Sequence, residues 1–100
     1  MLLHTVMWRF KDAEGKTAAE NRELVKQGLL ALPQEVEALE NIEFFENVVA
    51  CARNFDAMLR VTVADEAALE AYKTHPAHQK VARYVREVTT DRAAVDIFVD

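Results

Sequence analysis

The segment Glu66–Val81, EAALEAYKTHPAHQKV, decides how the fold is interpreted, because it holds two helical patterns separated by a proline. Asp65 is placed to cap a short helix that runs from Glu66 to about Lys73. Pro76 cannot continue that helix, and proline favours the first turn of a new one. We therefore expect a second helix from Pro76 to about Val88.

Upstream of this segment the pattern predicts a strand, a helix and two further strands. The alternation in Leu2–Phe10 indicates a strand that is apolar on both faces. A capping box at Thr17–Glu20 starts a helix that Pro33 ends. Within that helix, Gly28 is expected where the helix lies close to a sheet. Two further strands are expected upstream, at Ile42–Val49 and Ala57–Val63, and a last strand, Ala93–Val99, follows the segment.

The resulting order, β-α-β-β-α-α-β, is typical of the ferredoxin-like split βαβ arrangement. This predicts an α+β fold in which helices cover one face of a four-stranded antiparallel sheet. One domain is expected over residues 1–100. By alternation the other sheet face is also apolar, and such a face predicts a homodimer. Its expected members are Leu3, Met7, Phe45, Val49, Met58 and Phe98.

Composition excludes several classes of function. The net charge of −5 argues against nucleic acid as the main partner, because binding phosphate needs a basic face. No apolar run approaches the ~20 residues of a membrane span, so no membrane partner is expected. Cys51 is the single cysteine, which excludes an intrachain disulfide and a cysteine zinc site. A protein of the reducing cytoplasm is the default expectation.

The residues that could carry chemistry gather around the proline junction. Tyr72 lies on the inner stripe of the short helix, and His78 lies in the first turn of the next helix. The helix dipole there should keep His78 neutral, so that it can act as a base beside a phenol. His4 and Trp8 share one face of the first strand, and we expect them to complete a small apolar pocket.

Simpler structural roles stand beside these assignments. His75 precedes Pro76 and would serve as a helix N-cap, although it is also a candidate for binding substrate. Tyr72 and His78 could each be ordinary core residues with satisfied hydrogen bonds. The spacing of His75 and His78 could suit a metal, but Pro76 breaks the helix between them and no acid is adjacent. No metal is therefore assigned. The chain lacks serine, which excludes a serine hydrolase.

The chain resembles the stress-responsive A/B barrel (Dabb) family over nearly its whole length. The resemblance lies in His4–Lys11, in the block Leu69–His78 and in the closing strand Val95–Phe98. The ending His-Pro-Ala-His of the block is its most specific part. The resemblance implies a ferredoxin-like fold that dimerises into an α/β barrel. Some members hold a metal through backbone carbonyls after the first helix, but residues 33–41 match that stretch poorly.

One plant branch of this family, the olivetolic acid cyclases, performs an aldol cyclisation without an organic cofactor. Its catalytic histidine and assisting tyrosine match His78 and Tyr72, and its N-terminal pocket histidine matches His4. A further pocket histidine of that branch corresponds to Ala57, so this chain lacks it. The resemblance thus implies catalytic roles for His78 and Tyr72 and a place for His4 in the pocket. From their positions in the sequence, Trp8 and His75 are added to His4 as candidates for binding substrate.

Three functions remain open on the sequence. The first is cofactor-free proton abstraction from a small apolar carbonyl or aromatic compound, as in the cyclases. The second is a non-catalytic, stress-responsive dimer that binds a small molecule or is purely structural. This second function predicts a filled interior without a ligand-sized cavity. The third is a cofactor-independent monooxygenase like those of related dimeric barrels.

Overall fold

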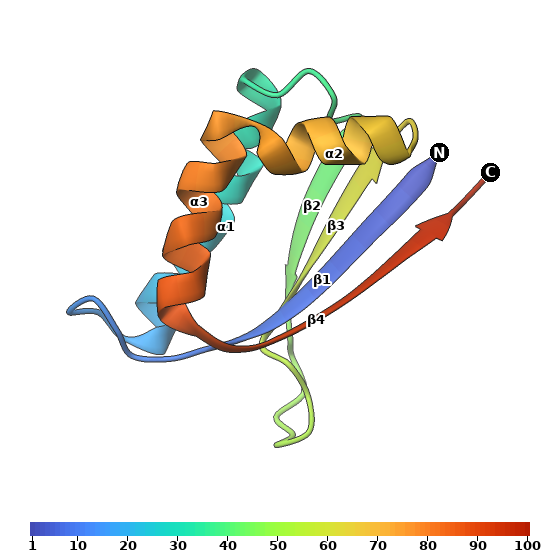
Figure 1. Ribbon diagram of the computed structural model, residues 1–100. Helices are drawn as coiled ribbons and strands as arrows, with labels where there is room; N and C mark the ends of the chain where they lie inside the picture. The colour runs from blue at the N-terminus through green and yellow to red at the C-terminus, as the bar shows by residue number, and fades with distance from the viewer.

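The computed structural model describes residues 1–100 as a four-stranded sheet with three helices packed on one face (Figure 1). The strands are β1 Leu2–Phe10, β2 Asn41–Glu46, β3 Ala57–Val63 and β4 Thr89–Phe98. The helices are α1 Ala18–Leu30, α2 Glu66–Thr74 and α3 Pro76–Val88, with a single 3-10 turn at Leu32–Gln34. No helix has both the length and the apolar character of a membrane-crossing segment.

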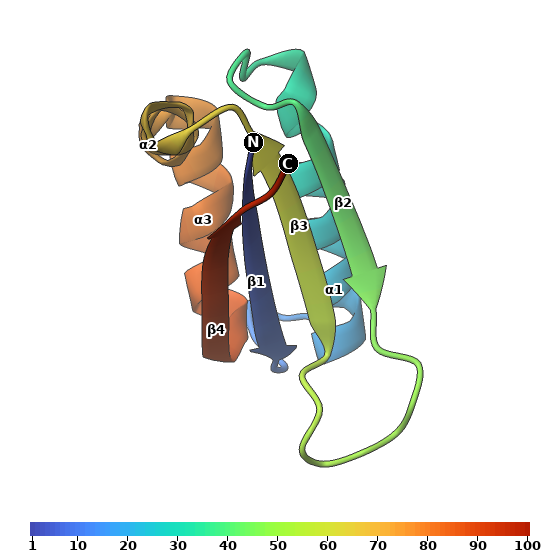
Figure 2. The same cartoon turned by 90° about the vertical axis from the view of Figure 1, so that its right-hand side faces the viewer.

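The sheet has the order β2-β3-β1-β4, and all neighbouring strands are antiparallel. Strands β1 and β2 flank β3, so the first βαβ unit is split by a strand from the second half of the chain. This is the ferredoxin-like α+β topology, and the prediction from the element order is confirmed. Both termini lie at the same end of the sheet, because Val99 donates its backbone N–H to the carbonyl of Met1 at 2.9 Å (Figure 2).

Two strand boundaries differ from those expected. Strand β2 ends at Glu46 instead of Val49, because the Asn47 side-chain amide donates to the Val49 carbonyl at 2.8 Å and turns the chain. Strand β4 begins at Thr89, directly after α3, rather than at Ala93. The Thr89 hydroxyl closes the last helical turn on the Val85 carbonyl at 2.8 Å, while its backbone is already extended.

The helix ends follow the local chemistry. Thr17 and Glu20 form the predicted capping box, with each side chain accepting from the other's backbone N–H. Asp65 caps α2 by accepting from the Ala68 N–H at 2.9 Å. At the junction the His75 Nδ1 accepts from the Ala77 N–H at 3.0 Å, and Pro76 occupies the first turn of α3. The predicted break between the two helices is confirmed.

The core lies between the sheet and the helices. Leu2, Val6, Leu59 and Val61 from the central strands are buried there, and Val25 of α1 is fully enclosed. The expectation that Gly28 lies against the sheet is wrong. A β-carbon at Gly28 would lie 3.4 Å from the Val81 side chain, so the glycine lets α1 approach α3 rather than the sheet.

The opposite face of the sheet carries no helix (Figure 2). The strand register places Leu3, Met7, Met58 and Phe45 on this open face, as expected. Two assignments to it are corrected. Phe98 pairs with Leu2 and therefore belongs to the helix side, while Val49 lies in the loop after β2. Their places on the open face are taken by two residues of β4, Val95 and Ile97.

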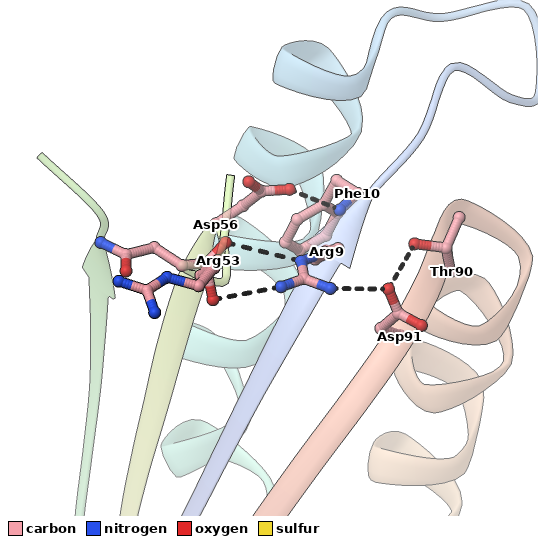
Figure 3. Close-up of polar contacts among 7 residues, drawn as sticks. Arg9, Phe10, Arg53, Asp56, Thr90 and Asp91 are labelled. Atoms are coloured by element: carbon pink, nitrogen blue, oxygen red, sulfur yellow. Dashed lines mark hydrogen bonds and ion pairs between the residues drawn. The ribbon is translucent and has the colours of Figure 1, made fainter. Parts of the chain in front are cut away.

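A long loop between β2 and β3 extends beyond the end of the sheet, and Arg9 ties it down. The Arg9 guanidinium donates to the carbonyl of Arg53 at 3.2 Å and to the carboxylate of Asp91 at 3.1 Å (Figure 3). It also lies 4.5 Å from the centre of the Phe55 ring. Asp56 adds a second tie by accepting from the Phe10 N–H at 2.8 Å. Arg9 of β1 thus links β4 and the loop between β2 and β3 at one end of the open face.

Candidate functional site

A cavity of about 670 Å³ lies between the sheet and the pair α2 and α3. Strands β1 and β3 supply its floor, α2 and α3 supply one wall, and the start of β4, which directly follows α3, also lines it. Its lining residues are His4, Val6, Trp8, Leu29, Leu59, Tyr72, Lys73, His78, Ala82, Val85, Arg86, Thr89, Thr90, Asp91 and Arg92. Four of the five residues chosen from the sequence therefore line one cavity.

His78 is held in a defined orientation by the end of the preceding helix. Its Nδ1 lies 3.0 Å from the Lys73 carbonyl oxygen, which can only accept, so Nδ1 carries the proton. In the neutral ring, Nε2 is then left with a free lone pair. Burial lowers the pKa of His78 below its usual value. The hydrogen bond to the Lys73 carbonyl opposes this shift, and the charges of His4, Arg86 and Lys73 add to it. The site thus contains a neutral imidazole base near pH 7.

Tyr72 presents the complementary group. Tyr72 is 1% exposed, and its hydroxyl oxygen has no hydrogen-bond partner among the atoms of the protein. Burial raises the pKa of this phenol well above its usual value, so the hydroxyl keeps its proton. The Tyr72 ring lies 4.4 Å from that of His78 and 6.5 Å from that of His4, measured between centroids. A buried donor without a partner is costly, and a ligand oxygen would satisfy it.

His4 is fixed by a carboxylate on the neighbouring strand. It is 5% exposed and pairs across the sheet with Asp96 of β4. The His4 Nδ1 donates to Asp96 Oδ1, and this hydrogen bond fixes the orientation of the His4 ring. The arrangement resembles the way a carboxylate sets the tautomer and the orientation of a histidine in many active sites. It leaves Nε2 as the second polar atom of the ring.

Trp8 and His75 have different surroundings. Trp8 is 5% exposed, lines the cavity and pairs with Ala57 of β3. His75 does not line this cavity, because its ring caps α3 and faces a separate groove between α1 and α3. The structure therefore brings His4, Trp8, Tyr72 and His78 together and leaves His75 outside. No group of three or more metal-ligating side chains is found.

Two features of the site were missed from the sequence. Asp96 was not considered, although an acid inside an otherwise apolar closing strand is a signal for a buried polar partner. The cations Lys73, Arg86 and Arg92 at the cavity were also missed. They come from three elements that are separate in sequence, and only the tertiary fold brings them to one rim.

The fold and this cavity define a class, an α+β ferredoxin-like domain with a histidine- and tyrosine-lined cavity between sheet and helices. The sequence matches the family model of the Stress responsive A/B Barrel Domain (Dabb) over residues 2–99. The chain therefore belongs to the Dabb family, as its opening strand and its His-Pro-Ala-His block predicted. A comparison with curated proteins found no match.

Solved structures resemble the whole chain. A dimeric ferredoxin-like protein of unknown function from Jannaschia sp. CCS1 is 26% identical, with 98% of each chain covered and a TM-score of 0.77. A similar dimeric protein from Thermobifida fusca is 23% identical, with 98% of this chain and 90% of that one covered and a TM-score of 0.82. A hydroxynitrile lyase from Passiflora edulis is 10% identical, with 99% and 93% covered and a TM-score of 0.82. At these identities the second and third similarities concern the fold alone.

Proposed function

We propose that this chain forms a homodimer and performs general acid–base chemistry, without an organic cofactor, on a small carbonyl compound bound in the cavity. The observation that carries the proposal is the pairing of a neutral His78 with the unpartnered hydroxyl of Tyr72. A base and a hydrogen-bond donor with separated pKa values are what enolisation requires. The mainly apolar lining would hold the rest of the molecule.

In this mechanism His78 Nε2 removes a proton from the carbon next to the carbonyl. The electron pair of the broken C–H bond forms the enolate double bond, and the carbonyl π electrons move to oxygen. Tyr72 donates a hydrogen bond to that oxygen as its negative charge develops. The enolate carbon can then take the proton back from His78, or it can attack a second carbonyl carbon in the same molecule, as in an aldol cyclisation. In the second case the first C=O bond re-forms, the π bond of the second carbonyl breaks, and its oxygen takes the proton from His78. His4, held by Asp96, would orient the substrate.

The geometry supports this function over a purely structural dimer. A structural dimer predicted a filled interior, whereas the cavity holds about 670 Å³ beside His78. It also gave His75 the role of a helix cap, which it has. That role is compatible with either function, because His75 lies outside the cavity. The position of Ala57 opposite Trp8 supplies no polar group, so the chemistry proposed depends on His78, Tyr72 and His4.

The homodimer is supported by the open face of the sheet. This face holds Leu3, Met7, Phe45 and Met58, together with Val95 and Ile97, of which Ile97 is 47% exposed in the single chain. Covering such a face with a second copy would remove its apolar surface from water. The dimeric relatives from Jannaschia and Thermobifida fusca add to this argument. We expect two sheets to stack face to face, forming an α/β barrel.

The proposal is tested by hydrogen–deuterium exchange, which needs no knowledge of the natural substrate. Acetophenone and 2-heptanone are incubated with the protein in D₂O, and loss of the proton signal next to the carbonyl is followed by NMR. Wild-type protein should accelerate exchange. His78→Ala should lower the catalysed rate by about 10²–10⁴-fold. Tyr72→Phe should lower it by about 10²-fold, because it removes one donor to the oxyanion.

The control is His75→Asn, which removes a histidine three positions away while keeping an N-cap side chain. It should leave exchange unchanged, since His75 does not line the cavity. Exchange that survives in His78→Ala would overturn the mechanism. Binding of the ketones that requires Tyr72 and His78, without any exchange, would instead identify a non-catalytic binding protein.

A further inference from the structure

Three cationic side chains surround the cavity, and none of them has a partner within the chain. Lys73 is at the end of α2, Arg86 is in the last turn of α3 and Arg92 is near the start of β4. The ion pairs of this structure are His4–Asp96, Arg9–Asp91 and Arg22–Glu46. None of the three side chains makes a hydrogen bond within the chain either. All three are exposed to solvent around the same opening.

This grouping runs against the overall charge of the protein. The chain has 17 acidic and 12 basic residues, so an opening with three free cations is not what its composition favours. Two carboxylates also line the cavity or lie beside it, but both are already bound. Asp91 accepts from Arg9, and Asp96 accepts from His4. The charges left without a partner at the opening are therefore positive.

We propose that the cavity selects carbonyl compounds with an anionic group, whose carbonyl end lies at Tyr72 and His78 while Lys73, Arg86 and Arg92 bind the anion. This inference rests on the function proposed above and specifies its substrate class. Lysine and arginine both bind oxyanions, and a guanidinium can bind a carboxylate or a phosphate through two parallel hydrogen bonds. The shared chemistry is an oxyanion at the end of the molecule that faces solvent.

The position of the cations suits this role mechanistically. They would hold the anion at the rim, away from the buried hydroxyl of Tyr72, so the reacting carbonyl remains free to enter the interior. Positive charge near the site also favours the neutral form of His78. A positively charged opening would in addition attract anionic substrates and repel cationic ones.

The test compares three ketones that differ only in the group opposite the acetyl. They are 4-acetylbenzoate, its methyl ester and 4-acetylphenyl phosphate. Catalysed deuterium exchange at the acetyl methyl is measured for each, relative to its uncatalysed exchange. We expect KM for the carboxylate to be about ten-fold lower than for the ester, with similar kcat, since one exposed ion pair contributes about two- to five-fold and at least two of the three cations would act together. The phosphate distinguishes a carboxylate substrate from a phosphorylated one.

The variants Lys73→Gln, Arg86→Gln and Arg92→Gln should each raise KM for the anions about two- to five-fold and leave the ester unchanged. Arg83→Gln is the matched control, because Arg83 lies one turn earlier on α3 and does not line the cavity. The ratio of KM for the ester to KM for the carboxylate should fall when the salt concentration is raised from about 0.01 M to about 1 M, because the Debye length falls from roughly 30 Å to 3 Å.

The outcomes separate this inference from the proposed function. Equal KM values for ester and anions, with exchange still dependent on His78, would overturn the anion preference and leave the acid–base function intact. A preference that persists in the triple Gln variant would also overturn the role of these three residues. Failure of all three ketones to bind or exchange would overturn both. Preference for the phosphate over the carboxylate would support the anion site and assign it to phosphorylated compounds.

Discussion

The two faces of the sheet are built from the same strands but differ in what covers them. On the helix side, Leu59 and Val61 are buried and the polar groups His4 and Tyr72 lie among apolar neighbours. On the open side, Met58 and Phe45 are at the surface, and the polar residue Arg9 is tied to the end of the face (Figure 3). Helices of the same chain cover one face of the sheet, and no part of the chain covers the other.

The difference shows how a small domain can hold a cavity beside its core. The covered face must accommodate a volume of about 670 Å³ that contributes no packing. Burial of apolar surface stabilises a fold by about 25 cal/mol per Å², so a cavity removes part of this contribution. Pairing the open face with a second copy would add apolar burial elsewhere. A dimer of the proposed kind would thus offset the packing that the cavity removes from the covered face.

The largest expected effect is on association. Met58→Glu would place a carboxylate in the middle of the open face, twice in a symmetric dimer. An unpaired buried charge costs about 3–5 kcal/mol, so the variant should be monomeric at concentrations where wild type is dimeric. Sedimentation velocity over a concentration series measures this. Gln79→Glu, an equal change at an exposed position of α3, is the control and should not alter the mass. A dimeric Met58→Glu would place the interface elsewhere.

The next largest effect is on the free energy of unfolding, which should respond differently to substitutions on the two faces. Leu59→Ala removes a side chain that is 2% exposed and should lower the free energy of unfolding by about 2–5 kcal/mol. Met58→Ala, its neighbour on the open face, should cost less at low protein concentration. Its cost should rise with concentration, because only the dimer would bury this side chain. Denaturant unfolding at two concentrations measures both. A concentration-independent cost for Met58→Ala would contradict burial in a dimer.

The sequence predicted the fold well because its strongest signals are local. Pro76 had to separate two helices, and Thr17 with Glu20 had to start one. The errors arose where tertiary contacts or turn chemistry decide. No residue before Asn47 indicates that β2 ends at Glu46. The alternation within β4 does not show which residues face the helices unless the pairing of Phe98 with Leu2 is known.

The candidate site was predicted only as far as it lies in one motif and one strand. Tyr72 and His78 are near in sequence, and His4 and Trp8 share a face of β1, so both pairs could be proposed from spacing. Asp96 could not be found this way, because its pairing with His4 depends on the β1–β4 register. His75 was proposed to bind substrate because it lies near His78 in sequence, whereas its position before Pro76 already favoured the cap that the structure shows.

A smaller effect distinguishes the cap from the cavity. His75→Ala removes the acceptor of the Ala77 N–H and should lower the free energy of unfolding by about 0.5–2 kcal/mol. His75→Asn should recover most of this, because asparagine is a good N-cap. Binding of acetophenone, extrapolated to fully folded protein, should be unaffected in both. Thermal unfolding with and without the ketone measures both quantities. Loss of binding in His75→Asn would place His75 in the cavity after all.

The smallest expected effect is a dependence of the free energy of unfolding on pH, which arises from His78 on the cavity side of the sheet. Burial lowers the pKa of His78 in the folded state below its ordinary value of 6.5, and this outweighs the opposing hydrogen bond to the Lys73 carbonyl. Between the lowered and the ordinary value the unfolded chain binds more protons than the folded one. The free energy of unfolding should therefore fall as pH is lowered from about 7 through 6.5, and it should continue to fall until the folded-state pKa is reached.

The variant His78→Gln isolates this contribution, because it keeps a polar side chain that cannot titrate. The difference in unfolding free energy between wild type and His78→Gln should shift in favour of the variant as the solution becomes more acidic. Met58→Gln on the open face is the control, and its difference from wild type should not change over the same pH range. Urea unfolding at a series of pH values gives both differences. A shift in the opposite direction would mean that folding stabilises the imidazolium, and a base that is protonated near pH 7 could not perform the proposed proton abstraction.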